Sequence, residues 1–232
     1  MLDCWSLLEQ EGPLAVANVF GGIPELSRIP TWDAIGGATD IAEHVRERIA
    51  EDAKALGTAG VTPVNLPFLG ENYRDAPPPL LSEIARALVD SVPATSRLYA
   101  PAVVGDPHPD HVLVRRLALK LFRQGVPTTL YAELPYAVQF GWPHWVTGAE
   151  RNPRVDVDVF WNRFREAVPE LRSAEAEVVV LTGDKRRRKL DAIRLYRTQF
   201  AGMDVHGVLS NPEIHGYEVF WPLGSSTQSR VR

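Results

Sequence analysis

The segment Leu98-Tyr-Ala-Pro-Ala-Val-Val-Gly-Asp-Pro-His-Pro-Asp-His111 joins an apolar run to the start of a long amphipathic stretch. The run 98–104 has the length and composition of a buried strand. Apolar residues then recur at helical spacing, at Val114, Leu117, Ala118, Leu121 and Phe122. Most of the charged residues lie outside this apolar stripe. This pattern predicts a strand followed by a helix over 109–124, with one buried and one wet face.

Two histidines lie at the start of this predicted helix. His108 and His111 are three residues apart with Asp110 between them, and counting back from Val114 places both on an extension of the buried face. If 98–104 is a strand of a parallel sheet, the pair stands at its carboxyl edge, where open α/β sheets bind ligands. Such a pair can hold a metal, or one ring can bind metal while the other handles a proton. Alternatively, histidines at a helix start only cap the helix or fill a rim.

The rest of the chain alternates strands and helices. Strands are predicted at 14–20, 61–66, 98–104, 128–134, 177–181 and 218–221, and helices at 2–10, 41–56, 81–92, 109–124, 159–167 and 184–200. This order predicts an α/β fold with a Rossmann-like, mostly parallel sheet and helices on both faces. Residues 21–40 read as a long loop. The aromatic segment 135–145 reads as an irregular insertion that lines or covers something, with His144 on the surface or facing a pocket.

Composition excludes several classes of protein. Of 232 residues, 45% are hydrophobic and 23% charged, which is ordinary for a globular domain with a sizeable core. The net charge of −4 argues against nucleic-acid binding, and the basic run Lys185-Arg-Arg-Arg-Lys189 is read as one exposed helix turn. A single cysteine, Cys4, fits a reducing compartment. The sequence shows neither a membrane span nor a leader, so we expect a cytoplasmic protein without membrane or nucleic-acid partners.

Four segments, in order, resemble the PIG-L (LmbE-like) family of N-acetylglucosaminyl deacetylases. They are the strand and glycine loop at 16–22, the helix Arg48-Ile-Ala-Glu51 ending in Leu56-Gly57, the block at 105–118, and the helix with Lys189, Ile193, Tyr196 and Gln199. Thr198 stands where the family has serine. No single motif is decisive, but their joint spacing is specific. The resemblance implies one domain over 1–223, followed by a disordered tail at 224–232.

The resemblance also implies a chemistry and residue roles. Family members use a divalent metal, usually Zn²⁺, to hydrolyse the acetamide of an amino sugar or its conjugate. By position, His111 matches a metal ligand and His108 matches the histidine that, as imidazolium, stabilises the oxyanion. Asp110 matches the carboxylate that tunes that histidine. A cation at the carbonyl and a donor at the oxyanion both lower the barrier to amide hydrolysis.

The family's first motif, His-x-Asp-Asp, is not found in this sequence. It supplies two further metal ligands and the general base, and it ends a first strand just before a helix that Leu2–Leu8 resembles. Asp3 aligns behind the motif, and Cys4 is read as a small buried helix residue rather than a substitute thiolate ligand. We therefore expect a sheet with its first strand missing, unpaired strand edges, and weakly held metal.

Two explanations of the missing motif remain open. The sequence begins at an internal methionine of a longer protein, which the intact downstream pattern favours, or it is a degenerate remnant. The leading hypothesis is a metal-dependent deacetylase of N-acetyl amino sugars, impaired as the chain stands and possible as a homo-oligomer. The alternative is a non-catalytic protein that binds carbohydrate or a partner, with 136–145 and 21–40 as its working surface.

Overall fold

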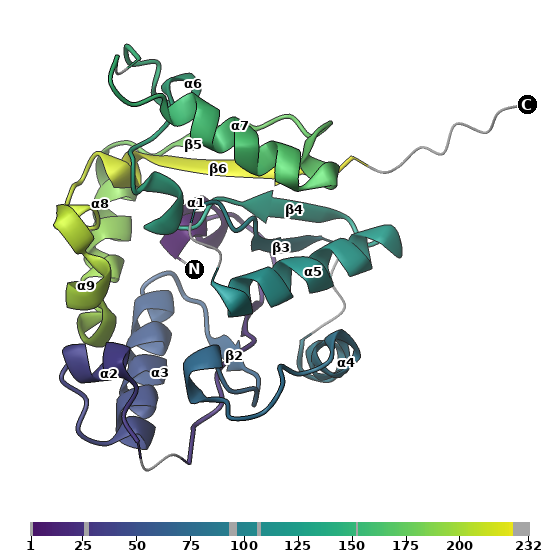
Figure 1. The fold of residues 1–232 in the computed structure, drawn as a ribbon, viewed down its shortest axis with the longest axis vertical. Helices are drawn as coiled ribbons and strands as arrows, with labels where there is room; N and C mark the ends of the chain where they lie inside the picture. The colour runs from purple at the N-terminus through teal and green to yellow at the C-terminus, as the bar shows by residue number, and fades with distance from the viewer. Residues whose placement is uncertain (1, 26–27, 93–96, 106–107, 152, 225–232) are drawn as a thin grey trace, which may run out of the picture.

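The computed structural model describes residues 2–25, 28–92, 97–105, 108–151 and 153–224 (Figure 1). Six strands alternate with helices along these residues. The strands are β1 (Val16–Asn18), β2 (Pro63–Asn65), β3 (Leu98–Pro101), β4 (Thr128–Tyr131), β5 (Glu177–Val180) and β6 (Tyr217–Pro222). The helices are α1 (Trp5–Leu8), α2 (Thr31–Ile35), α3 (Ile41–Gly57), α4 (Leu81–Ser91), α5 (Pro109–Arg123), α6 (His144–Thr147), α7 (Val157–Ala167), α8 (Gly183–Ile193) and α9 (Arg197–Met203).

The strands form two sheets. β1 and β2 pair in parallel, and a second sheet has the order β3-β4-β6-β5. β3 and β4 are parallel, whereas β6 runs antiparallel to both β4 and β5, so the larger sheet is mixed rather than entirely parallel. The predicted α/β class is confirmed. Within the described ranges, β1 pairs only with β2, and β3 pairs only with β4.

Helices cover both faces of the larger sheet, as predicted. On one face, α5 packs against β3 and β4, and Trp161 of α7 packs against Trp221 of β6. On the other face, α1 and α8 pack with Leu181, which follows β5. Side chains of β6 alternate between these faces because successive residues of a strand point in opposite directions.

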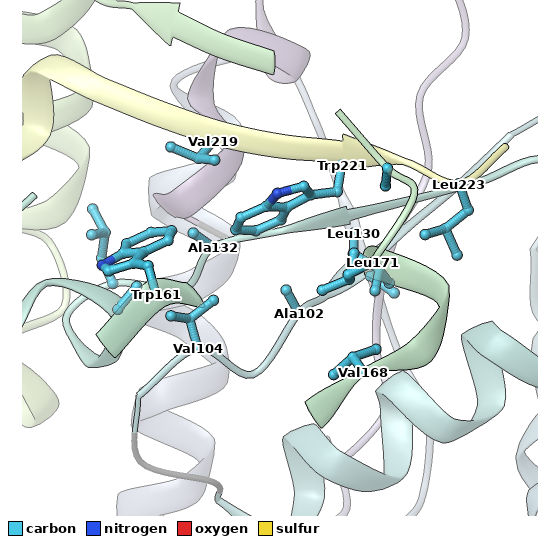
Figure 2. Close-up of a cluster of buried hydrophobic side chains, with 14 of the residues drawn as sticks. Ala102, Val104, Leu130, Ala132, Trp161, Val168, Leu171, Val219, Trp221 and Leu223 are labelled. Carbon is cyan, nitrogen blue, oxygen red and sulfur yellow. The ribbon is translucent and has the colours of Figure 1, made fainter. Parts of the chain in front are cut away.

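Tryptophans dominate the main core (Figure 2). Trp161 of α7 and Trp221 of β6 are fully buried, with ring centroids 5.9 Å apart. Trp142 and Trp145 from the aromatic segment pack on Trp161 at 5.7 and 5.6 Å. Part of the predicted insertion therefore fills the core, because large aromatic side chains bury the most apolar area per residue.

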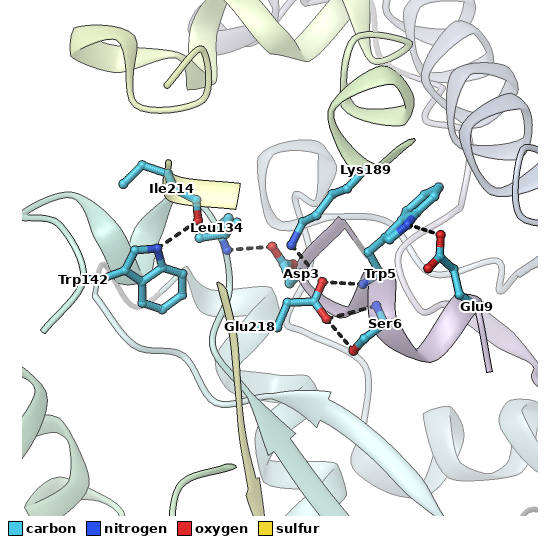
Figure 3. Close-up of polar contacts among 9 residues, drawn as sticks. All are labelled: Asp3, Trp5, Ser6, Glu9, Leu134, Trp142, Lys189, Ile214 and Glu218. Carbon is cyan, nitrogen blue, oxygen red and sulfur yellow. Dashed lines mark hydrogen bonds and ion pairs between the residues drawn. The ribbon is translucent and has the colours of Figure 1, made fainter. Parts of the chain in front are cut away.

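A buried ion pair fastens the N-terminal helix to the sheet (Figure 3). Lys189 Nζ lies 2.8 Å from Glu218 Oε1, and both side chains are 0% exposed. The Glu218 carboxylate also accepts hydrogen bonds from the backbone N–H groups of Trp5 and Ser6. A carboxylate is well placed there because the first N–H groups of a helix lack internal partners. The prediction of a fully exposed basic turn at 185–189 is therefore wrong for Lys189.

Most predicted strands are longer than the observed ones, and two predicted segments also contain a different number of helices than expected. The helix predicted over 184–200 is two helices, α8 and α9, and the loop predicted over 21–40 contains the short helix α2. The predicted tail lies outside the described residues except for Gly224. No helix of the described residues is both long and apolar enough to cross a membrane.

Candidate functional site

His108 and His111 stand at the N-terminus of α5, just beyond the carboxyl end of β3, as the sequence predicted. His108 is the N-cap residue, and its Nδ1 accepts a hydrogen bond of 3.3 Å from the Asp110 backbone N–H. The two imidazole centroids are 5.2 Å apart. A ring nitrogen that accepts a hydrogen bond carries no proton, so this contact places the ring proton of His108 on Nε2.

His111 faces the protein rather than open solvent. Its Nδ1 lies 3.1 Å from Glu133 Oε1, and its ring meets the edge of Tyr136 at a centroid distance of 5.5 Å. The side chain is 36% exposed, so one side of the ring remains accessible. The ring therefore lies at the edge of the sheet, where its Nδ1 contacts a buried carboxylate and part of the side chain remains exposed.

Glu133 was not identified from the sequence. It follows β4, the strand next to β3, and is 3% exposed. Burial raises the pKa of its carboxyl group, while His111 and the Val103 N–H oppose that rise. In the sequence, Glu133 is distinguished only as a lone acidic residue at the end of an apolar strand. Its proximity to His111 follows from the pairing of β3 with β4, which the sequence does not show.

The Asp110 carboxylate is engaged away from the histidines. Its Oδ1 lies 2.9 Å from an Arg74 guanidinium nitrogen, and its Oδ2 accepts a 2.8 Å hydrogen bond from the Glu71 N–H. Arg74 also donates to the Leu69 carbonyl, so it ties this loop to α5. The tuning role that the resemblance implies for Asp110 stays a prediction, because its contact with His108 described above runs through the backbone.

The donors do not complete a metal site. Across the described part of the chain, no three His, Cys, Asp or Glu side chains converge as metal ligands. One imidazole falls short of the three protein ligands usual for catalytic zinc. Cys4 is buried, and burial raises the pKa of its thiol well above its usual range, which disfavours the thiolate that binds metal. Asp3 instead accepts a hydrogen bond from the Leu134 N–H.

Two of the other three segments of the resemblance, at 48–57 and 189–199, contact each other. Glu51 of α3 accepts hydrogen bonds from the N–H and the hydroxyl of Thr198, at the start of α9. Arg48, one turn earlier, pairs with the buried Asp33 of α2 at 2.7 Å. These residues hold α2, α3 and α9 together, and a threonine hydroxyl serves in the place of the family's serine.

A shallow pocket lies in the aromatic segment. Its lining includes Phe140, Trp142, His144, Arg151 and Asp158. Asp158 holds His144 Nδ1 at 2.8 Å and Arg151 at 3.1 Å, so His144 both packs at the surface and borders the pocket. Phe140 is 56% exposed and leaves an aromatic surface beside these charges.

The fold of the described residues is similar to the fold of several solved deacetylases. The antimicrobial A40926 pseudoaglycone deacetylase Dbv21 is 22% identical, with 95% of this chain and 90% of that chain covered and a TM-score of 0.61. A triple mutant of a deacetylase of the teicoplanin biosynthetic pathway is 23% identical, with 99% and 93% covered and a TM-score of 0.68. The zinc-inhibited form of teicoplanin deacetylase Orf2 is 23% identical, with 93% and 88% covered and a TM-score of 0.60. No protein-family model and no curated protein sequence matches the chain.

Proposed function

We propose that this protein is a hydrolase of the deacetylase class, acting on the acetamide of an N-acetylated amino sugar or its conjugate. The observation that carries the proposal is the pair His108 and His111 at the N-terminus of α5, with Glu133 behind His111. The shared fold with antibiotic deacetylases supports it. The described residues carry one half of such a site, so we infer that activity of the chain as it stands is impaired.

The residues present suit part of the chemistry. An amide carbonyl becomes an oxyanion during hydrolysis, and a donor placed at that oxygen lowers the barrier by several kcal/mol. His108, with its proton on Nε2, is the candidate donor. Zinc is the metal the resemblance implies, but the described donors do not complete its site, so we assign no step to it.

Acetate release from an N-acetylglucosaminyl conjugate tests the proposal. We expect slow release above the buffer rate, reduced in His108→Ala and in His111→Ala. Calorimetry with zinc alone is expected to show binding well below one equivalent, and less still in His111→Ala. Release that is unchanged in both variants would show that these histidines are not the reacting groups.

A second candidate function is binding of carbohydrate without catalysis. The pocket beside Phe140 favours it, because an exposed aromatic ring next to paired charges is typical of a small-molecule site. Phe140→Ala is then expected to abolish binding of an N-acetyl amino sugar, while His108→Ala leaves it unchanged. The reverse result supports the hydrolase.

A further inference from the structure

The two oxygens of the Glu133 carboxylate have different partners. Oε2 accepts a 2.6 Å hydrogen bond from the Val103 N–H, and Oε1 lies 3.1 Å from His111 Nδ1. Val103 has φ +62°, a left-handed backbone conformation that β-branched residues rarely adopt. Glu133 therefore joins the turn after β3 to the first turn of α5.

The pair of atoms facing each other has no alternative partner. Glu133 Oε1 and His111 Nδ1 are both buried and lie 3.1 Å apart, but the angle between them is not that of a hydrogen bond, and neither atom has a hydrogen-bond partner within the described residues. Leaving a buried polar atom unsatisfied costs about 1–3 kcal/mol. A carboxylate oxygen only accepts, so a proton on Nδ1 together with a small rotation of the ring would satisfy both atoms.

We propose that Glu133 is a positioning residue that keeps the His111 proton on Nδ1 and thereby leaves a lone pair on Nε2. The catalytic consequence rests on the function proposed above: Nε2 is then the atom available to a metal or a proton. The second ring nitrogen of a functional histidine is commonly fixed in this way by a carboxylate.

The chain contains a matched arrangement for comparison. Asp158 accepts a backbone N–H, that of His144, on one oxygen at 3.0 Å and faces His144 Nδ1 with the other at 2.8 Å. This carboxylate–histidine pair joins the first residue of α6 to α7. Each pair is therefore a control for the other.

Replacement of Glu133 by glutamine, which has the same shape, distinguishes the two positions of the His111 ring proton, Nδ1 and Nε2. In Glu133→Gln, the amide oxygen retains the Val103 N–H and the NH₂ group turns to His111, which then needs a lone pair on Nδ1. Nitrogen-15 NMR of the histidine rings, with His111 assigned through His111→Gln, reports which nitrogen carries the proton. The measurement requires no enzymatic activity, so it succeeds or fails independently of the proposed function.

We expect Nδ1 of His111 to be protonated in the unaltered protein and to lose that proton in Glu133→Gln, with His144 unchanged. Asp158→Asn is expected to change His144 and not His111. The proposal is overturned if Nδ1 of His111 lacks a proton in the unaltered protein, or keeps it in Glu133→Gln.

Discussion

At the scale of single residues, the buried pair of Lys189 and Glu218 gives the sharpest stability prediction. Lys189→Ala leaves the Glu218 carboxylate fully buried without its ammonium partner. Breaking a buried pair in this way typically costs about 3–5 kcal/mol of unfolding free energy. The three hydrogen bonds that Trp5 and Ser6 donate to Glu218 remain, so we expect the lower end of that range in urea unfolding.

Arg187→Ala is the matched control for that measurement. Arg187 lies on the same helix and pairs with Asp184, but both side chains are mostly exposed. An exposed pair contributes less than about 1 kcal/mol because water and salt screen it. Similar losses in the two variants would contradict the assignment of Lys189 as a structural anchor of α1 and α8.

The residues that the sequence predicted are those whose environment is local. Spacing along one helix is enough to place His108 and His111 on one side of the start of α5. The contact of Glu133 with His111 depends instead on strand order, and the burial of Lys189 depends on the strand that packs beneath its helix. Lys189 reads as one of five consecutive basic residues, and only the position of β6 shows that it points inward.

At the scale of elements, the turn between β3 and α5 depends on Gly105. Its φ is +98°, and a Cβ there would lie 2.2 Å from the Tyr136 carbonyl oxygen. Gly105→Ala must therefore displace either this turn or the segment at Tyr136, both of which border His111. We expect a loss of several kcal/mol in urea unfolding, in the range of the exceptional single substitutions.

A comparison with Gly125, at the other end of α5, distinguishes the effect of the clash at Gly105 from the effect of backbone strain. Its φ is +95°, but a Cβ there meets nothing within 4 Å. Gly125→Ala is therefore expected to cost only the left-handed strain of about 1–2 kcal/mol. If the two alanine variants lose equal stability, the close approach of Gly105 to Tyr136 does not constrain the turn.

Most helices and strands could be predicted because the spacing of apolar residues within each segment is typical of one kind of element. The break between α8 and α9 was not, since the sequence at 194–196 contains neither Gly nor Pro. The break coincides with tertiary contacts: the Tyr196 hydroxyl donates to Asp52 at 2.5 Å, and Glu51 caps α9. Contacts between distant segments override helix propensity, which is a weak prior.

At the scale of the whole molecule, the stability should depend on pH through His215. This residue is fully buried in the turn before β6, and its Nε2 lies 2.8 Å from the Leu209 carbonyl oxygen. The pKa of His215 is lowered from 6.5 to about 4, chiefly by burial and also by Lys189, while the Leu209 carbonyl, Asp3 and Asp204 act in the opposite direction. The ring is therefore neutral in the folded protein at a pH where the unfolded chain is protonated.

The direction of the pH dependence follows from that difference. Between pH 6.5 and pH 4 the unfolded state binds more protons, so the stability due to a neutral His215 is complete above pH 6.5 and declines as the pH falls. A shift of this size corresponds to a loss of about 3 kcal/mol by pH 4. His215→Gln keeps a donor for Leu209 but cannot titrate, so its unfolding free energy should fall less steeply over this range. Carboxyl groups other than Asp3 and Asp204, which interact with His215, titrate alike in both proteins, so the difference between the two curves reports His215 and these two neighbours. Parallel curves in urea titrations from pH 4 to pH 7 would mean that His215 takes up its proton without unfolding the turn before β6.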